Sequence, residues 1–117
     1  MAKDDYHVIV YYLLSYLYDC LKKGRPVDKS IIRLEAYPEE IDPDYYRYIL
    51  EHLLKDGFIE GLYTYEAPIL GSKKVVQFRG VEDTRITPAG ISYLQENSFM
   101  KKAYETLKTL KDIMPFI

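Results

Sequence analysis

Arg85-Ile86-Thr87-Pro88-Ala89-Gly90-Ile91-Ser92-Tyr93-Leu94 is the most informative stretch of the chain, because a strand end runs directly into a capped helix there. The Thr87 hydroxyl can accept a hydrogen bond from an amide of the first helical turn. Pro88 suits the first helical position, where an N–H would have no partner. Ile91 and Leu94 then fall on one side of the helix. The stretch predicts an α+β fold in which a strand leads straight into a helix.

The residues before this junction predict a β-hairpin. Leu62-Tyr63-Thr64-Tyr65 and Val75-Val76-Gln77-Phe78 are rich in strand formers. Pro68, Gly71 and Ser72 lie between them and mark a loose turn. We therefore expect a hairpin within residues 58–86.

The first helix is predicted over residues 4–23. Asp4 or Asp5 can cap its start, and Gly24 is suited to its end. Two adjacent apolar stripes run along it, so we expect other helices to cover it on two sides. The stripes consist of Tyr6, Ile9, Leu13, Tyr16 and Cys20, and of Val10, Leu14, Leu17 and Leu21.

A pair of helices joined by a turn is predicted over residues 28–56. Asp28 can cap the short first helix. Asp42 and Pro43 form a strong start signal for the second, which ends before Gly57. Two short helices in this arrangement indicate a helix-turn-helix. The expected inner face of the second helix consists of Tyr46, Ile49, Leu50 and Leu53.

Two further helices are predicted at the C-terminal end, over residues 88–97 and 99–113, with Ser98 as the cap of the last. Apolar residues step along this last helix and beyond it by three and four positions, which suits a helix–helix seam. The seam has two interpretations, a homodimer contact or packing on the first helix of the same chain. Its residues are Met100, Ala103, Leu107, Leu110, Met114 and Ile117.

Together these elements predict one mostly helical α+β domain over residues 1–117. A helix-turn-helix followed by a hairpin that ends in a strand-to-helix junction is typical of a winged helix. The hairpin of residues 58–86 would be the wing, and the last helix would be an addition to that fold.

The composition is that of an ordinary globular domain, with 117 residues of which 48% are hydrophobic and 29% are charged. The one cysteine, Cys20, excludes an internal disulfide and favours the cytoplasm. The N-terminus is acidic, unlike a signal peptide. The apolar run of residues 8–18 is shorter than the ~20 residues that span a bilayer. We therefore expect a cytoplasmic protein with no membrane partner.

Side chains suited to catalysis or metal binding are not grouped in the sequence. His7 and His52 are the two histidines, and no ligand stands at metal-site spacing from His52. Asp42 and Asp44 flank Pro43, which is explained by their place at a helix start. A phosphate-cradling glycine loop and a nucleophile elbow are both missing. We expect a protein that is not an enzyme and that uses no cofactor or metal.

Three segments carry a family resemblance: Leu53-Leu54-Lys55-Asp56-Gly57-Phe58-Ile59-Glu60-Gly61, the residues 86–97, and the residues 102–112. In their order and spacing the chain resembles the YjcQ family of small bacterial and phage proteins. The resemblance implies a winged-helix fold. It implies no activity, because the family has no assigned biochemistry. The chain departs from the family in its Tyr-rich first helix and its long wing, which leaves room for a specialised partner.

The first functional hypothesis is duplex DNA binding, as in a small regulator. The helix over residues 43–55 would enter the major groove, and the wing would reach the phosphates. The difficulty is charge, since residues 1–72 have a net charge of −5 and residues 73–117 of +3, within a total of −2. The candidate contact residues are Tyr45, Arg47, Tyr48 and His52 on the helix and Lys73, Lys74 and Arg79 on the wing.

The alternative is a non-enzymatic protein–protein interaction module or a homodimer. The 13 tyrosines favour interfaces, because tyrosine combines an apolar body with a polar tip. The partner would meet the acidic, Tyr-rich helix of residues 43–55 and the apolar C-terminal helix. In the homodimer version, the stripe from Met100 to Ile117 is the self-association surface.

Overall fold

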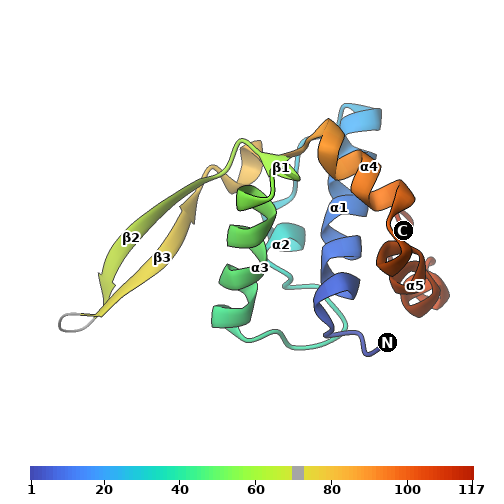
Figure 1. Cartoon of the computed structure of the whole chain (residues 1–117), viewed down its shortest axis with the longest axis horizontal. Coiled ribbons are helices and arrows are strands. Elements are labelled where there is room, and N and C mark those ends of the chain that lie inside the picture. Colours follow the sequence, from blue (N-terminus) through green and yellow to red (C-terminus); the bar gives the residue numbers. More distant parts are fainter. Residues whose placement is uncertain (70–72) are drawn as a thin grey trace.

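The computed structural model describes the backbone of residues 1–69 and 73–117, with side chains for residues 1–68 and 77–117. It has the mixed α+β composition that the sequence predicted (Figure 1). The α-helices are α1 (Tyr6–Lys23), α2 (Lys29–Ile32), α3 (Pro43–Lys55), α4 (Pro88–Glu96) and α5 (Ser98–Leu107). The strands are β1 (Ile59–Glu60), β2 (Tyr63–Ile69), β3 (Lys73–Arg79) and β4 (Arg85–Ile86), and the 3₁₀ turns are η1 (Val81–Asp83) and η2 (Lys108–Leu110).

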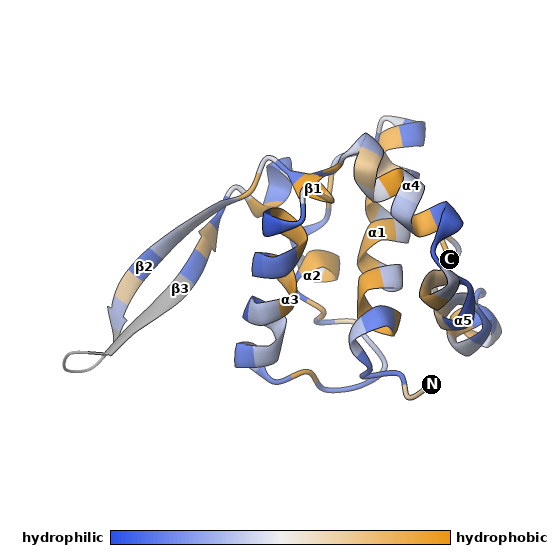
Figure 2. Cartoon of the chain, in the orientation of Figure 1, coloured by the Kyte–Doolittle hydropathy of each residue, from blue (hydrophilic) through white to orange (hydrophobic). Residues whose placement is uncertain are grey.

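Helix α1 forms the centre of the core. In Figure 1 it stands between α3 on one side and α4 with α5 on the other, and Figure 2 shows hydrophobic residues along much of its length. Both predicted stripes are buried over most of their length, as expected for a helix covered on two sides. The exceptions are at the two ends, where Tyr6 is half-buried and Leu21, in the last turn, is 46% exposed. The helix begins at Tyr6 after Asp5, two residues later than predicted.

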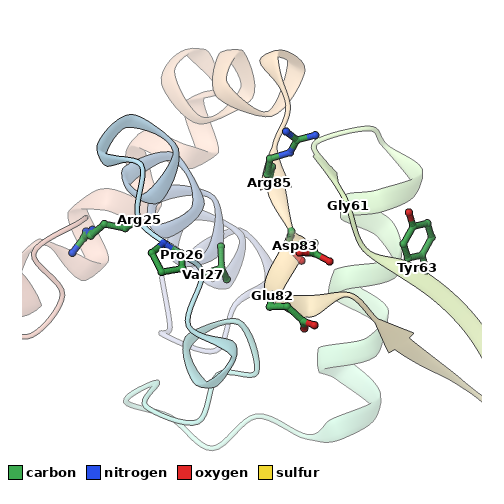
Figure 3. A pocket seen from close by; sticks show the side chains of 9 residues that line it. Arg25, Pro26, Val27, Gly61, Tyr63, Glu82, Asp83 and Arg85 are labelled. Atoms are coloured by element: carbon green, nitrogen blue, oxygen red, sulfur yellow. The ribbon is translucent and has the colours of Figure 1, made fainter.

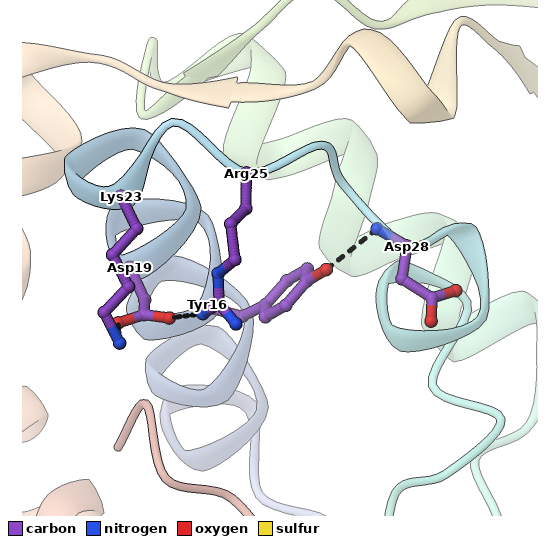
Figure 4. A network of polar contacts seen from close by, with 5 residues as sticks. All are labelled: Tyr16, Asp19, Lys23, Arg25 and Asp28. Atoms are coloured by element: carbon purple, nitrogen blue, oxygen red, sulfur yellow. Dashed lines mark hydrogen bonds and ion pairs between the residues drawn. The ribbon is translucent and has the colours of Figure 1, made fainter.

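The link from α1 to α2 is held by polar contacts with the end of α1 (Figure 4). Asp19 forms ion pairs with Lys23, at 3.0 Å, and with Arg25. Burial raises the pKa of Asp19, but the two cations lower it more, so the net shift is downward. The Asp28 amide donates to the Tyr16 hydroxyl at 2.8 Å. These contacts therefore fix the path of the link after α1 and position α2 against the core.

The two helices of residues 28–56 form where the sequence predicts them, although α2 is a single turn. Asp28 accepts a hydrogen bond from the amide of residue 30 and caps α2. Asp42 accepts from the Asp44 amide at 2.8 Å and caps α3, with Pro43 in the first turn. The predicted inner face of α3 is confirmed, because three of its four residues are buried and Tyr46 is half-buried. The face of α3 that carries these residues therefore packs against the core.

The predicted hairpin region of residues 58–86 contains two separate sheets. Strand β4 pairs with β1, in the register Ile59↔Ile86, and this pair lies against α1. Strands β2 and β3 pair with each other over seven residues each and project from the helices (Figure 1). They are longer than the four-residue runs that the sequence indicated. Gly61 and Gly80, with φ of +84° and +75°, let the chain turn from one sheet to the other and back.

The junction at residues 85–94 has the predicted geometry. The Thr87 hydroxyl accepts from the Gly90 amide at 3.0 Å and caps α4. The Thr87 amide donates to the Phe58 carbonyl oxygen at 3.0 Å, which continues the β1–β4 pairing. Gly90 is buried directly against that same carbonyl. The strand and the helix are therefore locked to β1 by backbone contacts.

The last helix is shorter than predicted. Helix α5 ends at Leu107 and tightens into η2, whereas the sequence indicated a helix to residue 113. Its cap is Asn97 rather than Ser98, because the Asn97 side chain accepts from the Phe99 amide at 2.8 Å. The chain then turns back, and this return places its final residue, Ile117, in the core.

The C-terminal stripe lies inside the chain. Helix α5 packs against α1, so of the two interpretations of the stripe the structure has the intrachain one. A homodimer seam through these residues would require the core to open. Met100, Ala103, Leu107, Met114 and Ile117 are buried, and Leu110 is half-buried.

Candidate nucleic-acid interface

The β2–β3 hairpin is attached to α3 by an aromatic contact at its base. The rings of Tyr46 and Phe78 lie 6.2 Å apart at 74°, an edge-to-face arrangement. Both side chains are half-buried. The rest of the hairpin extends away from the helices beside α3 (Figure 1). The exposed side of α3 and the hairpin therefore belong to one face of the molecule.

Two of the predicted DNA-contacting residues of α3 are engaged within the chain. The Tyr45 hydroxyl donates to the backbone oxygen of Asp4 at 2.8 Å, which ties α3 to the N-terminal segment. Burial, followed by the carboxylates of Asp4 and Asp5, raises the pKa of Tyr45. Arg47 forms an ion pair with Asp44, and its side chain is only 22% exposed. Tyr45 and Arg47 are therefore both occupied by contacts within the chain and are not free on the outer face of α3.

Tyr48 and His52 are placed differently from Tyr45. The Tyr48 side chain is 53% exposed, and its ring lies 4.2 Å from the half-buried His52 ring. It also approaches Tyr6 at the start of α1, at 6.3 Å. Tyr48 is therefore available to a ligand on the side of α3 nearest α1, while His52 lies partly behind it.

The predicted cations of the hairpin fall on β3. The Arg79 guanidinium lies 4.8 Å from the centre of the exposed Tyr65 ring on β2, within cation–π range. Lys73 and Lys74 are in the backbone of β3, paired with Ile69 and Pro68. Their side chains lie outside the described residues.

A groove that the sequence did not reveal lies between the end of α2, the start of α3 and β3. We call it the α2–β3 groove and define it by Arg33, Tyr46, Arg47, Gln77 and Phe78; its volume is about 320 Å³. Its described lining residues include the two arginines and no carboxylate. Arg33 and Gln77 were missed because sequence spacing does not show that β3 passes the end of α2.

A second hollow, the β2-side hollow, lies on the other flank of the hairpin. It is lined by Glu51, Thr64, Tyr65 and Glu66 and has a volume of about 410 Å³. Both of its charged residues are acidic. The charged residues that line the two hollows are therefore arginines in the first and glutamates in the second.

Aromatic side chains from three helices meet on the side of α3 nearest α1. We call this the aromatic strip and define it by Tyr6, His7, Tyr48, His52 and Phe99. His7 stacks on Phe99 at 4.4 Å and lies 5.3 Å from Tyr6, which continues to Tyr48 and His52. Burial, with a smaller contribution from the nearby Asp56 carboxylate, raises the pKa of Tyr6 to about 12. No local pattern in the sequence indicates that residues so far apart would meet.

A further hollow of about 420 Å³ lies between the α1–α2 link and the segment around η1 (Figure 3). The Arg25 side chain points away from it, toward Asp19. The exposed carboxylates of Glu82 and Asp83 lie at its edge. Arg85 also lines the hollow and pairs with Glu60 at 3.4 Å, so its lining carries both signs of charge.

The described side chains offer little for other chemistry. No three His, Cys, Asp or Glu side chains among them gather closely enough to hold a metal ion. Cys20 is buried, with its thiol in the core. Within the same residues, none of the helices is both long and apolar enough to cross a membrane.

A comparison with protein families shows to which family the chain belongs. The model of the family described as YjcQ protein matches residues 11–113. The chain belongs to the YjcQ family. The resemblance seen in three segments is thereby confirmed over nearly the whole YjcQ chain. Neither curated proteins nor solved structures match it.

Proposed function

We propose that this YjcQ protein is a winged-helix protein that binds duplex DNA through α3 and the β2–β3 hairpin. The observation that carries the proposal is the contact of Tyr46 with Phe78, which holds the hairpin beside α3. A helix that can enter the major groove next to an arm that can reach the backbone is a common arrangement for DNA binding.

Charge indicates which element supplies the affinity. The exposed side of α3 carries Asp44, Glu51 and Lys55, and is acidic on balance. The hairpin of residues 63–79 carries three cations against one carboxylate. Because phosphate neutralisation supplies most non-specific affinity, the hairpin makes the main backbone contacts in this proposal. Tyr48 is then the most exposed predicted side chain of α3 that can meet the bases.

The test is fluorescence anisotropy of a labelled mixed-sequence duplex, at low and at physiological salt. We expect binding in the range of about 10⁻⁴ to 10⁻⁶ M at physiological salt, and tighter binding at low salt. The double variant Lys73→Glu/Lys74→Glu should lose this binding. The matched control is Lys101→Glu/Lys102→Glu, which makes the same change of charge on exposed residues of α5.

Two outcomes count against DNA binding by the hairpin. Wild-type protein that fails to bind at low salt removes duplex DNA as a ligand. Equal losses in the two double variants would mean that net charge, rather than the hairpin, governs binding.

The second candidate function is protein binding without catalysis, through the aromatic strip. Tyr48 and Phe99 are 53% and 44% exposed, and aromatic residues are enriched at protein interfaces. Sedimentation velocity over a range of concentrations tests whether the partner is a second copy. A concentration-dependent dimer that Tyr48→Ala/Phe99→Ala abolishes would support this function.

A further inference from the structure

The α2–β3 groove, rather than the β2-side hollow, is where the geometry points to a bound phosphate of the DNA backbone. In this proposal, which rests on the proposed DNA binding, the phosphate lies between the guanidinium groups of Arg33 and Arg47. The duplex then passes the hairpin on the β3 side. Arg33 and Arg47 are then phosphate contacts, and the duplex has a defined side of the hairpin.

The charge of the two flanks supports this choice. The α2–β3 groove is lined by two arginines and by the neutral donor Gln77. The β2-side hollow presents Glu51 and Glu66. A phosphodiester is attracted to the first and repelled by the second, and arginine can bind it through two parallel hydrogen bonds.

The shape of the α2–β3 groove fits the same ligand. Its lining includes the half-buried rings of Tyr46 and Phe78 and the exposed Arg33. An apolar floor beside cationic groups suits a deoxyribose next to its phosphate, since protein contacts to DNA backbone involve both.

The charge of Arg33 acts on the neighbouring Tyr46 side chain. Burial raises the pKa of Tyr46 to about 12, the Arg33 charge opposes this rise, and the Glu35 carboxylate adds to it. Arg33 lines the α2–β3 groove together with Tyr46. Arg33 is exposed, and its side chain can turn toward a ligand.

Arg47 is held by a partner that DNA could replace. Its ion pair with Asp44 joins residues one turn apart on α3, and the Asp44 side chain is 85% exposed. An exposed pair of this kind is worth only about 0–1 kcal/mol. A phosphate can therefore compete for Arg47, and removing the Asp44 charge should favour it.

The experiment measures how the affinity for a labelled mixed-sequence duplex depends on salt. Arg33→Gln should lower the slope of log K against log[salt] by about 1, as expected for one lost phosphate contact. Asp44→Asn should tighten binding, because it removes a repulsive charge and releases Arg47. The control is Lys101→Gln, which removes one charge from α5 and should leave the slope unchanged. Circular dichroism confirms that each variant is folded.

The failures of the two proposals are distinguishable. If the wild-type protein does not bind the duplex, both fall. If it binds and Arg33→Gln keeps the wild-type slope, only the phosphate site in the α2–β3 groove falls. That site is also overturned if Glu66→Gln tightens binding more than Asp44→Asn does, because each variant removes one carboxylate and the duplex would then lie on the β2 side.

Discussion

The ring of Tyr46 on α3 meets the ring of Phe78 on β3 edge-on, with their centres 6.2 Å apart. This contact joins the projecting hairpin to the helical part of the molecule. An aromatic pair of this kind contributes about 0.5–1.5 kcal/mol beyond the area it buries. The position of the hairpin relative to α3 therefore depends on a modest local interaction and can be changed without unfolding the core.

Phe78→Ala should release the base of the hairpin. We expect faster hydrogen exchange at the backbone amides of residues 63–67 and 77–79, with unchanged protection in α1, because the core does not rely on this contact. DNA affinity should fall with it. Tyr63→Ala is the control, since this hairpin side chain is 70% exposed. Equal exchange in the two variants would show that Phe78 does not hold the hairpin.

Leu107→Asp should unfold the protein. The Leu107 side chain is fully buried where α5 packs on α1, and a buried unpaired carboxylate costs at least about 3 kcal/mol. Ile113→Asp, at a position 75% exposed, should change the unfolding free energy by less than about 0.5 kcal/mol. Urea unfolding followed by circular dichroism measures both. A folded, monomeric Leu107→Asp protein would mean that this residue forms a seam between chains instead.

Gly90→Ala should destabilise the protein, although alanine normally favours a helix by about 1 kcal/mol over glycine. A Cβ at Gly90 would overlap the Phe58 carbonyl oxygen and press on the Ile86 side chain. The melting temperature should therefore fall. Ala89→Ser, at an exposed neighbouring position, is the control and should have little effect. A rise in melting temperature for Gly90→Ala would show that α4 does not lie so close to Phe58.

The Asp19 ion pairs should stabilise the protein at neutral pH and not in acid. The pKa of Asp19 is lower in the folded chain than its ordinary value of 3.8. The stabilisation is therefore complete above that value and is lost as the pH falls through the folded-state pKa. Asp19→Asn should cost about 1 kcal/mol at pH 7, and the difference should shrink toward zero in acid. Urea unfolding of the wild-type protein and of Asp19→Asn, at pH 7 and in acid below the folded-state pKa of Asp19, measures this difference in unfolding free energy. A constant difference would contradict an ionic origin.

Alkali should unfold the protein through its buried tyrosines. Burial raises the pKa of Tyr12 from 10.0 to about 12, and Tyr16 and Tyr46 have similar values. Above pH 10 the unfolded chain loses these protons more readily than the folded chain, so stability falls as the pH rises toward 12. Tyrosinate absorbance and circular dichroism should change together. Ionisation at pH 10 of every tyrosine in a folded protein would contradict this burial.

The elements that depend on local chemistry could be predicted from the order of residues alone. The caps at Asp42 and Thr87, the first-turn prolines, and the apolar stripes of α1 are each set by residues within one or two helical turns. The family relationship was also visible in short segments. Local signals were less reliable at α5, where the Asn97 side chain takes the cap position and the helix ends early to bring the last residues into the core.

The candidate site was only partly predictable, because its geometry depends on contacts between distant residues. The sequence pointed to α3 and to the cations of β3. Only the tertiary structure could show that Tyr45 and Arg47 are held within the chain. The same applies to the α2–β3 groove, where Arg33 meets a strand more than forty positions away.

The division has a physical reason. Helix caps and turns depend on residues that are near neighbours in the sequence. Burial patterns depend on the spacing of apolar and polar residues, which can also be read from the sequence. The C-terminal apolar stripe could contact a second copy of the chain or pack on α1 of its own chain. Which of the two occurs depends on the apolar surface that lies next to it in the fold. For Leu107 and its neighbours that surface is α1 of the same chain, and packing there requires no partner to be brought from solution.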